Sequence, residues 1–297
     1  MSLAGFIFPF VFFANGTESN HVAIFRTETS EVRVSFFATD ERNRPVADIS
    51  KDDFAVVDNG TVVRDFRSLT HAAETELDVI ALVDASESVH PRMQDSMNDV
   101  LHLISSPQQG SDLHFSVISF SGLRPTLLCA GNCRSALAGQ RLQSLQAAGA
   151  TPLWDALADA ARLAARRQRP GMRSVLILFS DGRDTVSKAS ARDALEEIIA
   201  SGAILYSVDL NRPGSDPEAS TALQQMSEAT GGRAFSRDAG SSSVLEAALS
   251  DLRASYVVTY QLPSHIVGFH SLRILPKHNL NLRFHCRSGY YYEEPVQ

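Results

Sequence analysis

The sequence predicts an α/β fold, with a doubly wound and mostly parallel sheet of the Rossmann-like type flanked by a small β module. Two observations lead to this prediction. Between residues 77 and 254, short apolar runs alternate with helical stretches, as in a parallel sheet covered on both faces. On either side of that region, hydrophobicity alternates with a period of two, as in half-buried strands.

The central region carries the clearest strand and helix signals. Residues 78–83 and 175–179 are continuous apolar runs, as expected for strands buried on both faces. Weaker strand signals and the helical periodicity predict further elements: strands at 113–120 and 204–208, and helices at about 91–104, 152–167, 189–199, 218–229 and 244–254. Thr151 is predicted to be the N-cap of its helix, with Pro152 at the first helical position.

The flanking segments predict strands and a hairpin. Asn59-Gly60 separates the β-branched runs 54–57 and 61–63, and this dipeptide favours the tight turn of a hairpin. Three alternating runs follow residue 255. Both flanks should emerge at the edge of the sheet opposite the strand carboxyl ends. We therefore expect residues 21–72 and 255–297 to pack as one β module beside an α/β domain at 73–254.

Composition and the N-terminus restrict the partners and the compartment. The net charge is −7, from 27 basic and 34 acidic residues, so no broad basic surface for a nucleic acid is expected. Residues 5–14 form an apolar run too short to span a bilayer, which predicts a signal peptide within residues 1–20. No Lys or Arg precedes the run and Pro9 interrupts it, so a hydrophobic first strand is the alternative. Export is expected, and nothing else indicates membrane association.

The cysteines provide a second indication of compartment. Cys129 and Cys133 lie in the sequence C-A-G-N-C, whose Gly and Asn suit a tight turn. In an exported protein they should form a disulfide and leave Cys286 free, whereas in a cytosolic protein they would be two small apolar residues.

Polar clusters follow two of the buried runs and precede one helix. Asp84, Ser86 and Ser88 follow the first run, Asp181 follows the run at 175–179, and Thr151 precedes the helix at 152–167. Open parallel sheets bind ligands outside the carboxyl ends of their strands. Two carboxylates and three hydroxyls on one rim suit a hard cation such as Mg²⁺. Each residue alone could be a strand cap, a helix cap or a turn residue, but the set favours a metal site.

These elements resemble the metal-ion-dependent adhesion site of von Willebrand factor type A (VWA) domains. The matching motifs are D-x-S-x-S at 84–88, the Thr of G-A-T-P-L-W-D-A-L and the Asp of F-S-D-G-R-D-T. The resemblance covers about 77–254. The flanks resemble the bacterial VWFA-related acidobacterial family through the motifs N-R-P-V, K-D-D-F-A-V and R-S-G-Y-Y. The resemblance implies that Ser86, Ser88 and Thr151 offer hydroxyl oxygens to the metal, while Asp84 and Asp181 coordinate it directly or through water.

A cation held by so few carboxylates should recruit an Asp or Glu from a protein partner. We therefore expect a metal-dependent adhesion or scaffold module rather than an enzyme, with Mg²⁺ as the cation and Mn²⁺ or Ca²⁺ as alternatives. Two further acids lie near the cluster. Glu87 either tunes the charge of the site or faces solvent, and Asp184 is expected to be a solvated loop acid, with support of a ligand as the alternative.

Two other function classes remain open. A metal-assisted hydrolase on the same sheet would need a general base beside the metal, and Glu87 is the only obvious one. The sequence has no nucleophile elbow, dinucleotide-binding loop or phosphate-binding loop. A structural envelope protein with an incidental metal site is the third class.

Overall fold

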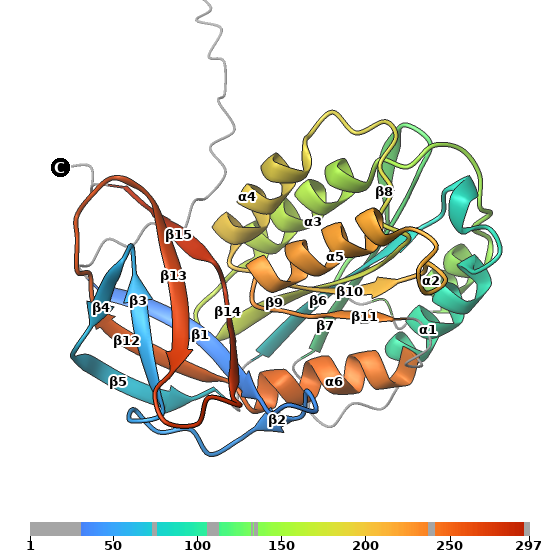
Figure 1. Ribbon diagram of the computed structural model, residues 1–297. Helices are drawn as coiled ribbons and strands as arrows, with labels where there is room; N and C mark the ends of the chain where they lie inside the picture. The colour runs from blue at the N-terminus through green and yellow to red at the C-terminus, as the bar shows by residue number, and fades with distance from the viewer. Residues whose placement is uncertain are drawn as a thin grey trace, which may run out of the picture.

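The computed structural model describes residues 31–72, 76–105, 113–131, 133, 136–236 and 241–293. The expected signal peptide at 1–20 lies outside these residues. Figure 1 shows two parts side by side: a central sheet covered by helices, and a group of strands drawn from both ends of the chain. Among the described helices, none is long and apolar enough to cross a membrane.

The central sheet is mixed. It contains, in spatial order, β11 (Ala234–Ser236), β10 (Ile204–Asp209), β9 (Met172–Ser180), β6 (Glu76–Asp84), β7 (Leu113–Ser121) and β8 (Arg124–Cys129). The first five strands run parallel, and β8 pairs with β7 in the antiparallel direction. The middle strands β6 and β9 are buried along nearly their whole length, which explains their uninterrupted apolar sequences. The α/β class predicted from the sequence is confirmed.

Helices cover both faces of this sheet (Figure 1). One face packs against α3 (Leu153–Arg167), α4 (Ala191–Ser201) and α5 (Pro217–Ala229). The other packs against α1 (Met93–Ser105), α2 (Ala136–Gln143) and α6 (Ser241–Arg253). The buried side of α3 consists of leucines and alanines three or four residues apart, so α3 lies close to the sheet and to α4.

The remaining strands form two antiparallel sheets, here called the terminal sheets. The first has the order β14 (Arg283–Cys286), β1 (Glu31–Thr39), β12 (Tyr256–Gln261) and β5 (Phe66–His71), with β2 (Pro45–Val46) paired to β1. The second has the order β15 (Gly289–Tyr292), β13 (Gly268–Pro276), β3 (Phe54–Asp58) and β4 (Thr61–Val63). Residues from both ends of the chain therefore share one apolar core.

The turn between β3 and β4 has the predicted hairpin conformation. Asn59 and Gly60 both have positive φ, of 46° and 81°. This is the requirement of the tight two-residue turn whose twist matches that of the paired strands. The hairpin prediction is confirmed.

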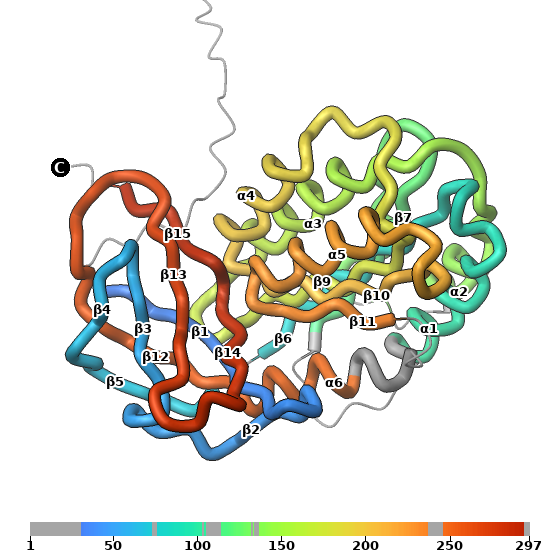
Figure 2. Tube along the Cα trace, in the orientation of Figure 1, coloured from blue at the N-terminus to red at the C-terminus, as the bar shows by residue number. Residues whose placement is uncertain are grey.

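The terminal sheets lie at the amino ends of the central strands (Figure 2). Arg173, near the start of β9, donates from Nη2 to Ser35 Oγ of β1 at 3.2 Å. The Ser288 backbone N–H donates to the Ala229 carbonyl at the end of α5, at 2.7 Å. Asp84, by contrast, ends β6 at the opposite edge of the central sheet.

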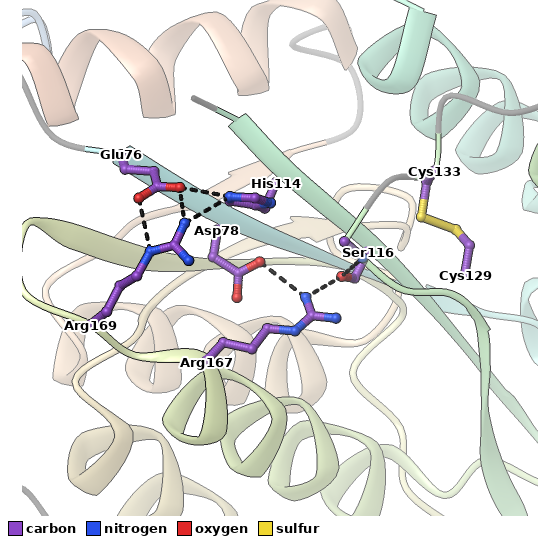
Figure 3. Close-up of polar contacts among 9 residues, drawn as sticks. Glu76, Asp78, His114, Ser116, Cys129, Cys133, Arg167 and Arg169 are labelled. Atoms are coloured by element: carbon purple, nitrogen blue, oxygen red, sulfur yellow. Dashed lines mark hydrogen bonds and ion pairs between the residues drawn. A yellow bond between two sulfur atoms is a disulfide. The ribbon is translucent and has the colours of Figure 1, made fainter. Parts of the chain in front are cut away.

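A disulfide joins Cys129, the last residue of β8, to Cys133 (Figure 3). Cys286 is a free thiol. Both outcomes agree with the prediction from the sequence. The bond ties Cys133, which is fully buried, to the end of the edge strand β8.

Candidate metal centre

Asp84 is the centre of a buried hydrogen-bond network at the carboxyl edge of the sheet. β6 and β9 are parallel neighbours, so their carboxyl ends place Asp84 beside Ser180. The Ser180 hydroxyl donates to Asp84 Oδ2 at 2.6 Å, and the Ser86 backbone N–H donates to Oδ1 at 2.9 Å. The Asp84 side chain is fully buried. Its orientation is therefore fixed by two donors, neither of which carries a charge.

The electrostatics of Asp84 follow from this environment. Burial raises the pKa of its carboxyl from 3.8 to about 6, opposed by the hydrogen bonds from Ser180 and Ser86. The negative charge of Asp181 makes a smaller contribution to this raised pKa. The two carboxylates are thus close enough to repel each other. At neutral pH the rim holds excess negative charge, which a cation would neutralise.

Ser86 and Ser88 lie together on the segment after β6. The Ser86 hydroxyl lies 3.1 Å from the Ser88 hydroxyl. Ser86 is buried and Ser88 is exposed, so the pair leads from the interior to the surface. Glu87 begins a short 3-10 helix at Glu87–Val89 and is exposed. The structure therefore favours the interpretation in which Glu87 faces solvent.

The loop that carries Thr151 is tied to the same segment by backbone hydrogen bonds. The Glu87 N–H donates to the Gly149 carbonyl at 3.1 Å, and the Ala148 N–H donates to the Ala85 carbonyl at 2.9 Å. Gly149 has a φ of +81°, and a Cβ there would lie 3.4 Å from the Gly122 backbone. This distance is an ordinary van der Waals contact, so it is the positive φ that favours glycine at this position.

The prediction that Thr151 caps α3 is wrong. The cap position is occupied by Pro152, which has no side-chain capping bond. Asp184 caps the helix instead, because its Oδ1 accepts from the N–H groups of Leu153 at 2.9 Å and Trp154 at 3.4 Å. Asp184 is half-buried, so the expectation of a solvated loop acid is corrected as well. The Thr151 hydroxyl has no hydrogen-bond partner among the described residues, although Thr151 is only 3% exposed.

Asp181 lies on the turn after β9. Its Oδ1 accepts from the Arg183 N–H at 3.1 Å, and its carbonyl accepts from Asn211 Nδ2 at 2.7 Å. Gly182 has a φ of +78°, and a Cβ there would lie 2.7 Å from the Ala219 carbonyl of α5. Only glycine therefore fits at this position beside Asp181.

The sequence profile of the von Willebrand factor type A domain matches residues 78–249. The chain belongs to the von Willebrand factor type A family. VWA domains often bind a divalent cation, generally act as interaction modules rather than enzymes, and often mediate protein–protein interaction. The match spans β6 to α6, and so includes Asp84, Thr151 and Asp181.

Similar solved structures include other proteins with VWA domains. A von Willebrand factor type A structure from Catenulispora acidiphila is 17% identical, with a TM-score of 0.47, and the alignment covers 91% of this chain and 65% of that one. An aerotolerance-related membrane protein from Bacteroides fragilis is 19% identical, with a TM-score of 0.44 and coverage of 60% and 98%. Proximal thread matrix protein 1 of the mussel byssus is 18% identical, with a TM-score of 0.47.

The alignment with proximal thread matrix protein 1 covers 61% of this chain and 49% of the mussel protein, so this chain spans about half the length of that relative. A search of curated proteins finds no match.

The VWA rim fits a hard cation through oxygen atoms alone. Within the described residues there is no group of three or more His, Cys, Asp or Glu side chains that could hold a metal. Two carboxylates are present, and any further ligands must be hydroxyls or water. The unpartnered, nearly buried Thr151 hydroxyl fits this requirement, as do the adjacent hydroxyls of Ser86 and Ser88.

Three residues that organise the rim were not predicted. Ser180 holds Asp84, Thr185 accepts from the Thr151 N–H at 2.8 Å, and Asp155 of α3 accepts from the Lys188 and Ala189 N–H groups. Only Ser180 had a signal in the sequence, because it ends a buried strand beside Asp181. The other two contacts depend on how the loop after β9 folds over the start of α3.

Proposed function

We propose that Asp84, Ser86, Ser88, Thr151 and Asp181 bind a divalent cation, expected to be Mg²⁺, and that the bound ion captures an acidic side chain of a protein partner. The observation that carries this proposal is the buried Asp84 carboxylate, held by neutral donors and repelled by Asp181. The cation would supply positive charge and open coordination positions. The hydroxyls and carboxylates of the chain would orient it at the surface.

The chain's own residues define what the site can do. Ser180 and the Ser86 N–H hold the Asp84 carboxylate in one orientation. Two carboxylates neutralise a divalent ion without filling its coordination shell, so an oxygen of a third carboxylate, from a partner, could occupy an open coordination position. Ser88 is exposed, which leaves the outer side of the rim accessible to a partner.

A binding role is favoured over hydrolysis. A metal-assisted hydrolase needs a general base positioned near the metal-bound water. Glu87 was the only candidate base, and its side chain is exposed. Turnover of ester or phosphoester substrates by the Mg²⁺-loaded protein, lost in Asp84→Asn, would favour the hydrolase instead.

The test is capture of a partner from an extract of the native cell envelope. The wild-type chain should retain a partner in Mg²⁺ and release it in EDTA, and Asp84→Asn should fail to retain it in Mg²⁺. Asp184→Asn is a matched control that keeps both rim carboxylates. Retention by Asp84→Asn, or retention unchanged by EDTA, would contradict metal-dependent capture.

We also propose that the protein is exported. The Cys129–Cys133 disulfide supports this location, since such bonds persist in oxidising compartments. Protein isolated from its native host under thiol-blocking conditions should show one alkylatable cysteine, Cys286. Three alkylatable cysteines would contradict export.

A further inference from the structure

A cavity of about 640 Å³ lies between the VWA domain and the terminal sheets. Its volume is in the range of small-molecule sites, roughly 300–1,000 Å³. Apolar side chains line much of it, including Phe36 of β1, Met172 of β9, Ile199 of α4 and Val257 of β12. It lies at the amino edge of the sheet, opposite the proposed metal centre, and is independent of it.

The charged lining of this cavity is entirely basic. Four arginines line it, and no aspartate or glutamate does: Arg33, Arg169, Arg173 and Arg287. His285 also lines it, but burial lowers the pKa of its imidazole to about 4, so it adds no positive charge at pH 7. The chain as a whole has a net charge of −7, so this local excess of positive charge is not a general property of the surface. A positively charged, partly apolar cavity is suited to an amphipathic anion.

Arg173 reaches the cavity from the start of β9. Its Nη1 donates to the Leu252 carbonyl at 3.3 Å and to Ser255 Oγ at 2.6 Å, and its Nη2 donates to Ser35 Oγ at 3.2 Å. These acceptors are all neutral, and no carboxylate of the described residues forms an ion pair with Arg173. Burial lowers the pKa of its guanidinium, as expected for a cation without a counter-charge.

Arg287 reaches the cavity from the segment between β14 and β15. Its Nη2 donates to the Arg33 carbonyl at 3.1 Å, and its Nε is buried without a hydrogen-bond partner. No carboxylate of the described residues pairs with it. Asp58 influences it only through space, and that carboxylate already accepts from Tyr260 and Tyr290. A buried donor left unpaired costs free energy, so the Arg287 side chain is not fully satisfied within the chain.

The two guanidinium groups approach the same stretch of β1. Arg173 contacts Ser35 and Arg287 contacts the carbonyl of Arg33, two residues away. Arg169, by contrast, is already neutralised by Glu76, which also contacts His114 (Figure 3). Arg33 is exposed, so the buried positive charge without a carboxylate partner is on Arg173 and Arg287.

We propose that this cavity binds a small organic carboxylate with an aliphatic or aromatic body. Arg173 and Arg287 hold the carboxylate, and the apolar side chains of both parts of the molecule surround the rest of the ligand. Arginine suits this role because its planar N–H groups match the two oxygens of a carboxylate. A ligand bound here would also stabilise the contact between the VWA domain and the terminal sheets.

Calorimetric titration of the full chain in EDTA with octanoate, octanamide and inorganic phosphate tests the proposal. Octanoate should bind at least tenfold more tightly than the neutral amide or phosphate. Arg173→Gln and Arg287→Gln should each weaken octanoate binding at least tenfold. Equal binding of octanoate and octanamide, tighter binding of phosphate than octanoate, or no octanoate binding at millimolar concentration would overturn the proposal.

Two further variants keep the test decisive if the buried arginine variants do not fold. Ala165→Trp fills the cavity from α3 without changing any charge, and should abolish octanoate binding. Arg33→Gln, at an exposed position, should weaken it about threefold. If all four variants keep wild-type affinity for octanoate, the arginines only hold the two parts together and the proposal is wrong. Asp84→Ala should bind octanoate like wild type, which separates this site from the metal centre.

Discussion

Strand β6 carries a fully buried aspartate near each end, and only the one near its start has a counter-charge within the described residues. Asp78, near the start, pairs with Arg167 Nη1 at 3.1 Å, and the same atom donates to Ser116 Oγ at 2.6 Å (Figure 3). Asp84, at the end, meets only the Ser180 hydroxyl and the Ser86 N–H, and no basic side chain of the described residues pairs with it. Burial raises the pKa of both carboxyl groups.

The difference contrasts a structural role for one end of the strand with the binding role proposed for the other end. At the amino edge, Asp78 pairs with Arg167, the last residue of α3, and Glu76 pairs with Arg169, so each carboxylate has a counter-charge within the chain, although Asp78 Oδ2 has no hydrogen-bond partner. At the carboxyl edge, Asp84 and Asp181 repel each other without an internal cation. An external cation would complete that edge as Arg167 completes the other.

The largest effect is expected from breaking the internal pair. Arg167→Met should lower the free energy of unfolding by about 3 kcal/mol at pH 7, because it leaves Asp78 buried without a counter-charge. The loss should shrink at lower pH, where Asp78 takes up a proton. Urea unfolding measures it. Arg192→Met, which removes an exposed pair with Glu196, is the control and should cost no more than about 0.5 kcal/mol. Equal losses in the two variants would contradict the structural role of the Asp78 pair.

Removing the charge of Asp84 is expected to stabilise the fold in EDTA, whereas removing the charge of Arg167 destabilises it. Its folded-state pKa is raised to about 6, so the stabilisation due to its protonation is complete below the unfolded value near 4 and is lost as the pH rises through 6. In EDTA at pH 7, the free energy of unfolding of Asp84→Asn should therefore be higher than that of wild type, by at most about 3 kcal/mol. The two proteins should converge toward pH 4.

Urea unfolding of both proteins between pH 4 and pH 8 measures this difference. Saturating Mg²⁺ should reverse it, because only wild type would bind the ion and gain stability. A variant less stable than wild type in EDTA at pH 7 would show that the ionised Asp84 carboxylate stabilises the fold, against this account.

The smallest changes in the free energy of unfolding are expected at Thr151 and at Asp184, which caps α3. Asp184→Ala should cost about 1 kcal/mol, the usual value of a helix N-cap, without preventing metal binding. Thr151→Ala should change the free energy of unfolding in EDTA by less than about 0.5 kcal/mol, because its hydroxyl caps nothing, but should weaken Mg²⁺ binding. Thermal unfolding and calorimetry separate the two. A larger loss of stability in Thr151→Ala than in Asp184→Ala would indicate that Thr151 caps α3 after all.

The middle strands of the central sheet were predictable because strands buried on both faces have continuous apolar sequences. The runs at 78–83 and 175–179 became β6 and β9, and the Asn59-Gly60 turn has its predicted conformation. The helix α2 at Ala136–Gln143 was not predicted, since alanine, glycine and glutamine give it little amphipathic periodicity.

The position of the candidate ligands at the carboxyl edge of the sheet was predictable, but the residues that support them were not. Polar residues after buried strands indicate a rim, whatever the loops do. The partner of Asp84 and the cap of α3 depend on contacts between residues 96 and 31 positions apart in the chain, Ser180 with Asp84 and Asp184 with Leu153. A single sequence carries no signal for such pairs. It therefore assigned the cap to the nearer candidate, Thr151.

The most direct measurement is calorimetric titration of wild type and Asp84→Ala with Mg²⁺ and with Mn²⁺, each with and without a soluble carboxylate ligand such as acetate. Wild type should bind one divalent ion, more tightly when the carboxylate is present, and Asp84→Ala should show no binding while retaining a cooperative unfolding transition. Equal heats from the two folded proteins, or no heat from wild type even with acetate, would contradict the claim that the carboxyl edge of this VWA domain is a metal site.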